Sequence, residues 1–301
     1  MARFATLRSL AAALALLLLW ACSGGDVEPR AESATPRSSA RLLPTTAAAA
    51  EFLALLVPAE RIVALPEQVD DFSSMDFRRD GFEKLPRFAR YVAEPLIALR
   101  PDLVITHAWQ AAETTHVLRQ SGLDVLVLDS ASSYDDVRAT IAKLGERLGV
   151  VERARQVSSE LDERIARVRV GAAARASWRA LVYSNDGSGG WTAGANTTVH
   201  ALLTMVGVRN AAAEAGLEGH VALDFERVVA LAPDVFVVSR PGRGDGDIAT
   251  IGVLESAGAL ANLPAIRERR VAVISSALLT ADSPTLVDAA ELLAREIDRL
   301  R

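Results

Sequence analysis

EPLIALRPDLVI, at residues 94–105, returns in the second half of the chain as ERVVALAPDVFV, at residues 226–237. The two stretches share Glu, Ala, Leu, Pro and Asp at five of their twelve positions, and five more positions exchange one apolar residue for another. Each copy predicts a short helix with an apolar stripe, a Pro-Asp turn that ends the helix, and a buried strand. A helix–turn–strand unit that occurs twice predicts two lobes built on one plan.

Short apolar, β-branched stretches alternate with helical stretches on both sides of each copy. In the first half, strands are predicted at residues 61–65, 103–106 and 125–128, and a helix at residues 111–121. In the second half, strands are predicted at residues 179–183, 235–239 and 271–275, followed by a terminal helix at residues 284–300. Strands that alternate with helices over short connections predict parallel sheets, so the expected fold class is α/β with two lobes.

A long charged segment, residues 134–172, separates the two sets of strands. Its apolar residues recur at steps of three or four: Ile141, Leu144, Leu148 and Val151, then Val157, Leu161, Ile165 and Val168. This spacing predicts an amphipathic helix, with a break near Gly149 as an open alternative. Because 20 helical residues extend about 30 Å, we expect this segment to join an N-terminal lobe (41–133) to a C-terminal lobe (173–301). Two surface helices of one domain are the alternative.

The composition is that of an ordinary globular chain: of 301 residues, 50% are hydrophobic and 24% are charged, with a formal net charge of −5. A mildly acidic chain lacks the basic stripe that nucleic acid binding requires, so no nucleic acid partner is expected. The single cysteine, Cys22, excludes an internal disulfide and a thiolate zinc site. Because no Gly-x-Ser-x-Gly motif occurs, we expect no enzyme and no catalytic residues.

The first 40 residues have the pattern of an export signal followed by a tether. Two arginines precede an apolar run at residues 10–20 that is too short to span a membrane, which predicts a signal peptide over residues 1–21. The run ends at Cys22 in a context that resembles the bacterial lipobox, where the cysteine is lipidated. Residues 22–40, rich in Ser, Ala and Pro, predict a flexible tether. We therefore expect a lipoprotein anchored to a membrane in the periplasm or at the cell surface; an ordinary signal peptide with an unmodified cysteine is the alternative.

Several short motifs follow one another along the two halves in a familiar order. They are LPTTAAAAEFL at residues 43–53, the two copies of the repeat, SGLDV at 121–125, GWTAG at 190–194, MVGVRN at 205–210 and LPAI at 263–266. On these motifs, residues 41–300 resemble the periplasmic substrate-binding proteins with a helical backbone. Members of that family serve ABC importers of ferric siderophores, haem and cobalamin.

The resemblance implies a fold, a function and partners. It implies two α/β lobes joined by one long backbone helix, with the ligand held in a cleft between the lobes. It implies delivery of that ligand to an ABC permease dimer with its ATPase subunits, by a protein that acts as a monomer and carries no cofactor. One glutamate of each lobe would meet arginines of the permease, and the matching positions here are Glu94 and Glu226, the first residues of the repeat.

Ligand contacts are expected from loops at the carboxyl ends of the strands, where open parallel sheets bind their ligands. In the first lobe these loops carry Thr45, Thr46, His107 and Trp109, and they include residues 66–72. In the second lobe they carry Asn185, Trp191 and Arg240. The two tryptophans would stack on a planar ligand, and the arginine would meet an anionic group.

The residues do not distinguish between three classes of ligand: a ferric siderophore, a corrinoid, and a related iron or cobalt chelate. A haem receptor and a free-metal receptor are further alternatives. Two of the four histidines, His116 and His200, fall on predicted helices, so no metal site is expected. A lipid-anchored sensor or scaffold that keeps the fold without transport also stays open.

Overall fold

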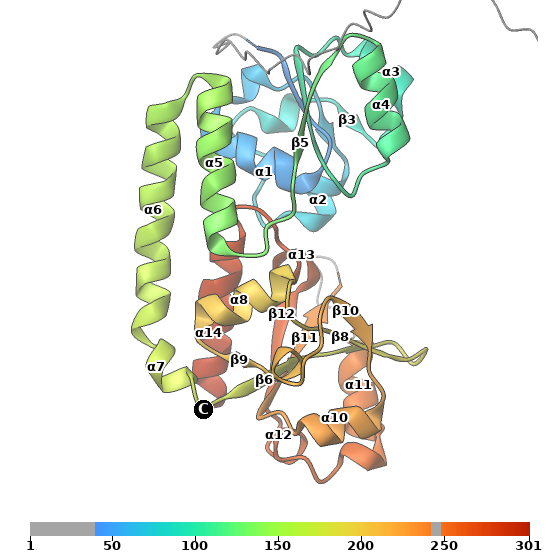
Figure 1. The fold of residues 1–301 in the computed structure, drawn as a ribbon, viewed down its shortest axis with the longest axis vertical. Helices are drawn as coiled ribbons and strands as arrows, with labels where there is room; N and C mark the ends of the chain where they lie inside the picture. The colour runs from blue at the N-terminus through green and yellow to red at the C-terminus, as the bar shows by residue number, and fades with distance from the viewer. Residues whose placement is uncertain (1–39, 242–247) are drawn as a thin grey trace, which may run out of the picture. The chain divides into compact units, whose positions relative to one another are not determined.

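Two parallel sheets, one from each half of the chain, organise the fold (Figure 1). The first has the order β1 (Leu42–Pro44), β4 (Leu103–His107), β5 (Asp124–Leu128). The second has the order β12 (Val271–Ser275), β11 (Val235–Arg240), β6 (Arg179–Val182), β9 (Arg209–Asn210). All pairs within these two sheets are parallel, which confirms the predicted α/β class.

The structure, a computed structural model, describes residues 40–241 and 248–301. The expected signal peptide, Cys22 and all of the expected tether but residue 40 lie outside the described residues. The described residues form one compact unit. Over the described residues, no helix combines the length and the apolar character needed to cross a bilayer.

The two copies of the repeat occupy the same place in the two sheets. Helix α3 (Ala93–Ala98) precedes the central strand β4, and α10 (Phe225–Leu231) precedes the central strand β11. After each helix the chain adopts a left-handed backbone, at Arg100 (φ 51°) and at Ala232 (φ 43°). Each copy therefore folds as the predicted helix, turn and buried strand.

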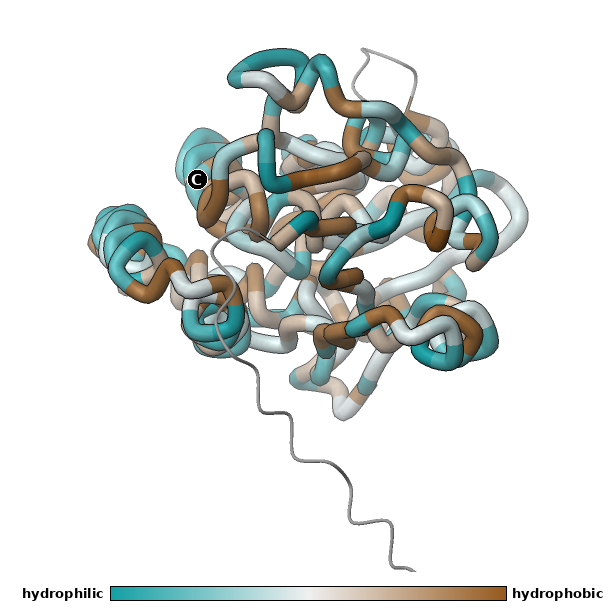
Figure 2. Tube along the Cα trace, turned by 90° about the horizontal axis from the view of Figure 1, so that it is seen from above, coloured by the Kyte–Doolittle hydropathy of each residue, from teal (hydrophilic) through white to brown (hydrophobic). Residues whose placement is uncertain are grey.

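The central strands bury both of their faces. On one face, Leu103 and Ile105 of β4 and Val235 and Val237 of β11 belong to a single apolar core that runs through both halves of the chain. On the opposite face, the strand residues belong to separate clusters, Val104 to one and Phe236 to another. Figure 2 shows the resulting distribution, with hydrophobic residues gathered inside and hydrophilic residues on the outer helices.

The segment between the lobes forms two helices, α5 (Tyr134–Leu148) and α6 (Val151–Val170), that lie side by side (Figure 1). The break falls at Gly149, whose φ of 69° ends α5. The predicted apolar stripe is buried except for Val151, which is 38% exposed. Because the break restarts the helical phase, Val151 begins α6 and does not continue the stripe of α5.

Helix α14 (Leu286–Leu300) joins the α6 side of the molecule to the second sheet, since it packs on α6, on β12 and on α8 (Thr198–Val206). Arg164 of α6 forms ion pairs with Asp288 and Glu291 of α14. The remaining helices are α1 (Ala47–Leu56), α2 (Gln68–Phe72), α4 (Ala112–Gln120), α7 (Ala172–Arg175), α9 (Ala211–Glu214), α11 (Ala249–Ser256), α12 (Pro264–Arg267) and α13 (Ser276–Leu279).

The minor strands pair in two small sheets. They are β2 (Leu65–Pro66) with β3 (Arg87–Phe88), and β10 (His220–Ala222) with β8 (Gly190–Ala193) and β7 (Ser184–Asn185). The strand predicted at residues 61–65 is wrong in extent, because only a single bridge, from Ile62 to Leu42, and the short β2 form there. A 3-10 turn at Ala59–Arg61 takes up the start of that stretch.

Candidate functional site

A pocket of about 290 Å³ lies between the two halves of the described chain. The first half contributes the start of α1, α2 and the segment after β4. The second half contributes α13 and the residues that follow it. The lining residues are Thr45, Thr46, Ala47, Ala48, Glu51, Gln68, Phe72, Trp109, Gln110, Ala277, Thr280, Ala281 and Asp282.

The threonines of the first lobe reach this pocket because β1 and β4 run parallel and end at the same edge of the sheet. The Thr45 backbone N–H donates to the Ile105 carbonyl at 2.9 Å, which continues the ladder past β1. Thr46 caps α1, since its hydroxyl oxygen accepts the Ala49 N–H at 3.1 Å. Both threonines are buried, and Thr46 also lies 2.8 Å from Nδ1 of His107.

His107, the last residue of β4, lies buried behind the pocket wall. Its ring stacks against Trp109, with the ring centres 5.8 Å apart and 25° between the planes. Its Nε2 has no hydrogen-bond partner and lies 3.9 Å from Oδ2 of Asp282 in the other half of the chain. Burial holds the pKa of His107 below its usual value, and Asp282 and Asp129 oppose that shift. A neutral ring follows from this balance at neutral pH.

The open face of the pocket is aromatic and amide-bearing. Trp109 is 59% exposed and Phe72 is 54% exposed, although both rings are large and apolar. Gln68 and Gln110 lie beside them, and the Gln110 amide donates to the Thr45 carbonyl at 3.4 Å. Among the described residues, no lysine or arginine lines this pocket. Its surface can therefore stack on a flat ligand and exchange hydrogen bonds, but it offers an anion no cationic partner.

A buried carboxylate, Glu51 of α1, lies at the inner end of the pocket and joins the two halves. It accepts hydrogen bonds from the hydroxyls of Ser73, Ser283 and Thr285. Burial, the largest effect, raises its pKa, and the three hydroxyl donors partly oppose that rise. Residues more than 230 positions apart are thus tied together beside the pocket.

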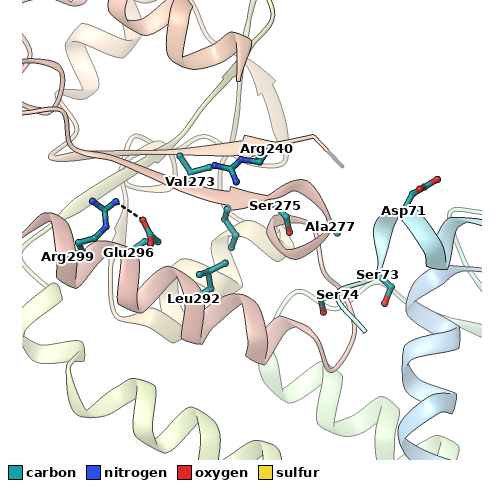
Figure 3. A pocket seen from close by; sticks show the side chains of 11 residues that line it. Asp71, Ser73, Ser74, Arg240, Val273, Ser275, Ala277, Leu292, Glu296 and Arg299 are labelled. Atoms are coloured by element: carbon teal, nitrogen blue, oxygen red, sulfur yellow. Dashed lines mark hydrogen bonds and ion pairs between the residues drawn. The ribbon is translucent and has the colours of Figure 1, made fainter. Parts of the chain in front are cut away.

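A second pocket, of about 660 Å³, lies beyond the contact between α2 and α13 and shares Ala277 with the first (Figure 3). Arg240 enters it from β11, and Ser73 and Ser74 face it from the first half of the chain. Arg299 also lines it but pairs with Glu296 on the same helix at 2.8 Å. Cationic side chains are therefore present in this pocket and not in the one beside Trp109.

A third pocket, of about 470 Å³, lies in the second half of the chain beside Trp191 and Asn185. Trp191 is 54% exposed, whereas Asn185 is buried. The Asn185 amide nitrogen donates to the Tyr183 hydroxyl at 3.0 Å, and its oxygen accepts the Gly187 N–H at 2.8 Å. These bonds occupy both ends of the Asn185 amide, so its side chain supports the local loop.

The structure thus brings four of the seven predicted ligand residues together and separates the other three. Those at the pocket between the halves are Thr45, Thr46, Trp109 and, behind its wall, His107. Arg240 lies in the second pocket, and Asn185 and Trp191 lie in the third. Within the described part of the chain, no group of three or more His, Cys, Asp or Glu side chains is arranged to hold a metal ion.

A family model described as periplasmic binding protein matches residues 69–278, which is more than half of the chain. The chain belongs to this family.

Three similar proteins illustrate the relationship. The uncharacterized ABC transporter substrate-binding lipoprotein YvrC of Bacillus subtilis (strain 168) is 26% identical over 218 residues, which is 68% of this chain and 64% of that protein. A cobalamin-binding protein of Halobacterium salinarum is 31% identical over 145 residues, 48% of this chain and 39% of that one. The solved periplasmic heme-binding protein BhuT, in complex with two hemes, is 26% identical with a TM-score of 0.74, and the match covers 87% of this chain and 99% of BhuT. The chain thus spans less than two thirds of the first two relatives.

In this periplasmic binding protein, Glu94 and Glu226 occupy matching positions at the second residues of α3 and α10. Both side chains are exposed, and neither forms an ion pair with another described residue. Each lies two positions after the extended N-cap residue of its helix, which is Val92 for α3 and Asp224 for α10. The two carboxylates are therefore placed equivalently in the two halves and are free to meet a partner.

Sequence reasoning marked residues 66–72 of this binding protein as a ligand loop without singling out a residue there, and it did not single out Glu51 or Asp282. Glu51 was detectable, because it is the single charged residue in the apolar helix AAAAEFLALL. Gln68 and Phe72 lie in the marked segment and line the pocket, on the five-residue helix α2, which is too short for a periodic signal. Asp282 follows α13 in a stretch without any motif, and its place opposite His107 depends on tertiary packing alone.

Proposed function

We propose that this protein is the substrate-binding component of an ABC importer, and that it holds a corrinoid or a related cobalt or iron chelate between its lobes. The observation that carries this proposal is the pocket beside Trp109, which joins two exposed aromatic rings with two glutamine amides and no cationic lining residue. We take residues 41–133 and 173–301 as the lobes that close on the ligand. Residues 134–172 would link them.

The chemistry of the pocket favours one kind of chelate. A flat macrocycle gains contact area on Trp109 and Phe72. Groups at its edge would meet Gln68, Gln110 and the Asp282 carboxylate, which suits neutral amides better than carboxylates. The corrin ring carries amide side chains, and the Halobacterium relative is named for cobalamin.

Delivery and location follow from the same proposal. Glu94 and Glu226 would pair with arginines of the permease dimer, whose ATPase subunits supply the energy. Lipidated Cys22 would anchor the protein to a membrane, in the periplasm or at the cell surface, as a monomer on the tether of residues 22–40. The relative YvrC is named a lipoprotein.

Haem is the second candidate ligand, and the presence of Arg240 in the lining of the larger pocket favours it. The larger pocket beside Ala277 offers this guanidinium to a propionate, and BhuT is named as a heme-binding protein. A ligand that occupied both pockets would require α2 and α13 to separate. A free-metal receptor, or a sensor or scaffold that binds no chelate, would be the outcome if both candidates failed.

The test is a titration of candidate ligands into the chain that begins at Ser23. Tryptophan fluorescence monitors binding, and calorimetry checks each result. The panel contains cyanocobalamin, ferric siderophores, and haemin together with its dimethyl ester, which keeps the ring and removes the carboxylates. Saturable one-to-one binding of cyanocobalamin, with the ester bound more tightly than haemin, is expected. Preference for haemin over its ester would move the assignment to the Arg240 pocket, and no binding across the panel would favour the sensor or scaffold.

A further inference from the structure

The proton on the His107 ring can be assigned from its neighbours. The hydroxyl oxygen of Thr46 accepts the N–H of Ala49, so its own proton is available to Nδ1 of His107, 2.8 Å away. A neutral ring that accepts this proton at Nδ1 carries its own proton on Nε2, and the nearby Asp282 carboxylate favours the same tautomer. That N–H is buried, lacks a partner and faces Oδ2 of Asp282 at 3.9 Å. A hydrogen bond to a carboxylate would need these atoms about 1 Å closer.

We propose that His107 and Asp282 form a latch that holds the two lobes together over the pocket beside Trp109. His107 belongs to β4 of the first lobe, and Asp282 belongs to the segment between α13 and α14 of the second. When the lobes approach by about 1 Å, which the proposal assigns to the chain in solution even without ligand, the buried N–H gains its missing acceptor. The role of the latch in ligand retention rests on the proposed function, whereas the contact between the lobes does not.

Asp282 is well placed to respond to a small rotation. The next residues, Ser283 and Thr285, are bound to Glu51 of the first lobe, so this segment is fixed at one point. Asp282 lies one position from that attachment, where a rotation of the lobes moves atoms only a little. A closure that is large at the lobe ends is therefore enough to bring Asp282 within hydrogen-bond distance of His107.

Two other carboxylates face this pair. Asp129 follows β5 and raises the pKa of His107 from the same lobe, while the pKa of Glu51 on α1 is raised in part by Asp282. Removal of Asp129 changes the charge near His107 but removes no contact between the lobes, because both residues belong to the first lobe. Asp129→Ala is therefore the matched control for Asp282→Ala.

The first measurement is the distance between two spin labels in the chain that begins at Ser23, without ligand. Cys22 is the single cysteine of the full sequence, so labels attach only at Glu113→Cys on α4 and Glu255→Cys on α11. Asp282→Ala is expected to shift the distance distribution to longer values, and Asp129→Ala to leave it unchanged. An unchanged distribution for Asp282→Ala, or an equal shift for Asp129→Ala, overturns the latch.

A second set of variants separates the latch from a general effect on folding. His107→Gln keeps an N–H donor and is expected to behave like the parent chain, whereas His107→Leu is expected to match Asp282→Ala. The double variant His107→Leu with Asp282→Ala is expected to shift no further than either single variant. Additive shifts of the label distance in the double variant would contradict a direct contact between His107 and Asp282. If His107→Leu does not fold, the label distance in Asp282→Ala alone tests the latch.

The last measurement uses cyanocobalamin as the probe. Its dissociation is expected to be about tenfold faster from Asp282→Ala, the factor for one hydrogen bond to a charged group, and unchanged for Asp129→Ala. An unchanged rate with Asp282→Ala contradicts the role in retention. If cyanocobalamin does not bind at all, the proposed ligand fails, while the label distances still test the latch.

Discussion

Asp102 is joined to Arg41 by two hydrogen bonds of 2.8 Å: its carboxylate accepts the Arg41 N–H, and its own N–H donates to the Arg41 carbonyl. Asp234 is joined to Arg179 by the same two bonds, also of 2.8 Å. Each aspartate thus fixes the start of a central strand to the start of its neighbour, β1 or β6. The Pro-Asp pair of the repeat has a structural role that its sequence context alone indicated only as a turn.

We expect Asp102→Ala and Asp234→Ala each to lower the free energy of unfolding by about 1–2 kcal/mol, because each leaves a backbone N–H without its acceptor. The loss is expected to be larger at Asp234, which is the less exposed of the two. Urea denaturation measures both, with the Asn variants as controls that keep an acceptor. Equal stability of the Ala and Asn variants would contradict the assigned bonds.

Reversal of both docking charges, Glu94→Arg with Glu226→Arg, should abolish uptake and leave ligand affinity nearly unchanged. Both carboxylates are exposed at matching helix starts and do not line the pocket beside Trp109. Uptake by cells and calorimetry on the purified chain provide the two readouts. Glu113→Arg with Glu255→Arg, an equal charge change on α4 and α11, is the control. Normal uptake by the first pair would refute the docking assignment.

Gly145→Ala should destabilise the protein by about 1–3 kcal/mol, although alanine is the better helix former. A Cβ at this position would lie 2.4 Å from the Cβ of Ala154, where α5 and α6 approach each other. Gly252→Ala in helix α11 is the control, because a Cβ there meets nothing within 4 Å. Thermal denaturation should show opposite signs for the two changes, with Gly252→Ala stabilising by up to about 1 kcal/mol.

Trp109→Ala should weaken cyanocobalamin binding by about tenfold or more, since it removes an exposed aromatic face from the pocket. Trp191→Ala removes a tryptophan of similar exposure from a different pocket and should leave affinity unchanged. Calorimetry on both variants measures the difference. A larger loss with Trp191→Ala would move the ligand to the third pocket.

The pH dependence of stability should contain a contribution from Glu51. Burial raises its folded-state pKa above the usual 4.5, so the folded chain binds this proton more tightly than the unfolded chain. The free energy of unfolding therefore falls as the pH rises from about 4.5 through the folded-state pKa. Glu51→Gln removes this term, and the stability difference between parent and variant, measured in urea from pH 4.5 upward, should change in that direction. A constant difference would contradict the raised pKa.

The strands and the repeat could be predicted because their signals are local. Strand residues that alternate between two buried faces form continuous apolar runs, such as residues 103–105 and 235–238, and the Pro-Asp turns mark where these runs begin. Val151 was wrongly assigned to the buried apolar stripe. Its spacing of three from Leu148 fits one continuous helix, but the break at Gly149 turns α6 to a new orientation, so Val151 is exposed.

The pocket could be predicted only in part, because half of it comes from packing. Trp109 lies just after the predicted strand at residues 103–106, where a general rule points to ligands, and Thr46 lies in the motif at residues 43–53 that carries the family resemblance. Phe72 and Asp282 meet them from short segments that carry no periodic pattern. Arg240 and Trp191 satisfy the same rule yet face other pockets, since the rule gives the edge of the sheet and not the direction of the loop.

The core shared by both halves has a consequence for how the chain matures. Helix α14 is the C-terminal helix of the described residues, yet seven of its apolar residues between Leu286 and Ile297 belong to the same core as α1 and β4. Until residues 283 and 285 arrive, Glu51 also lacks two of its three hydroxyl donors. We therefore expect a chain that ends before this helix to stay open and susceptible to protease, and the chain that includes it to melt in a single transition.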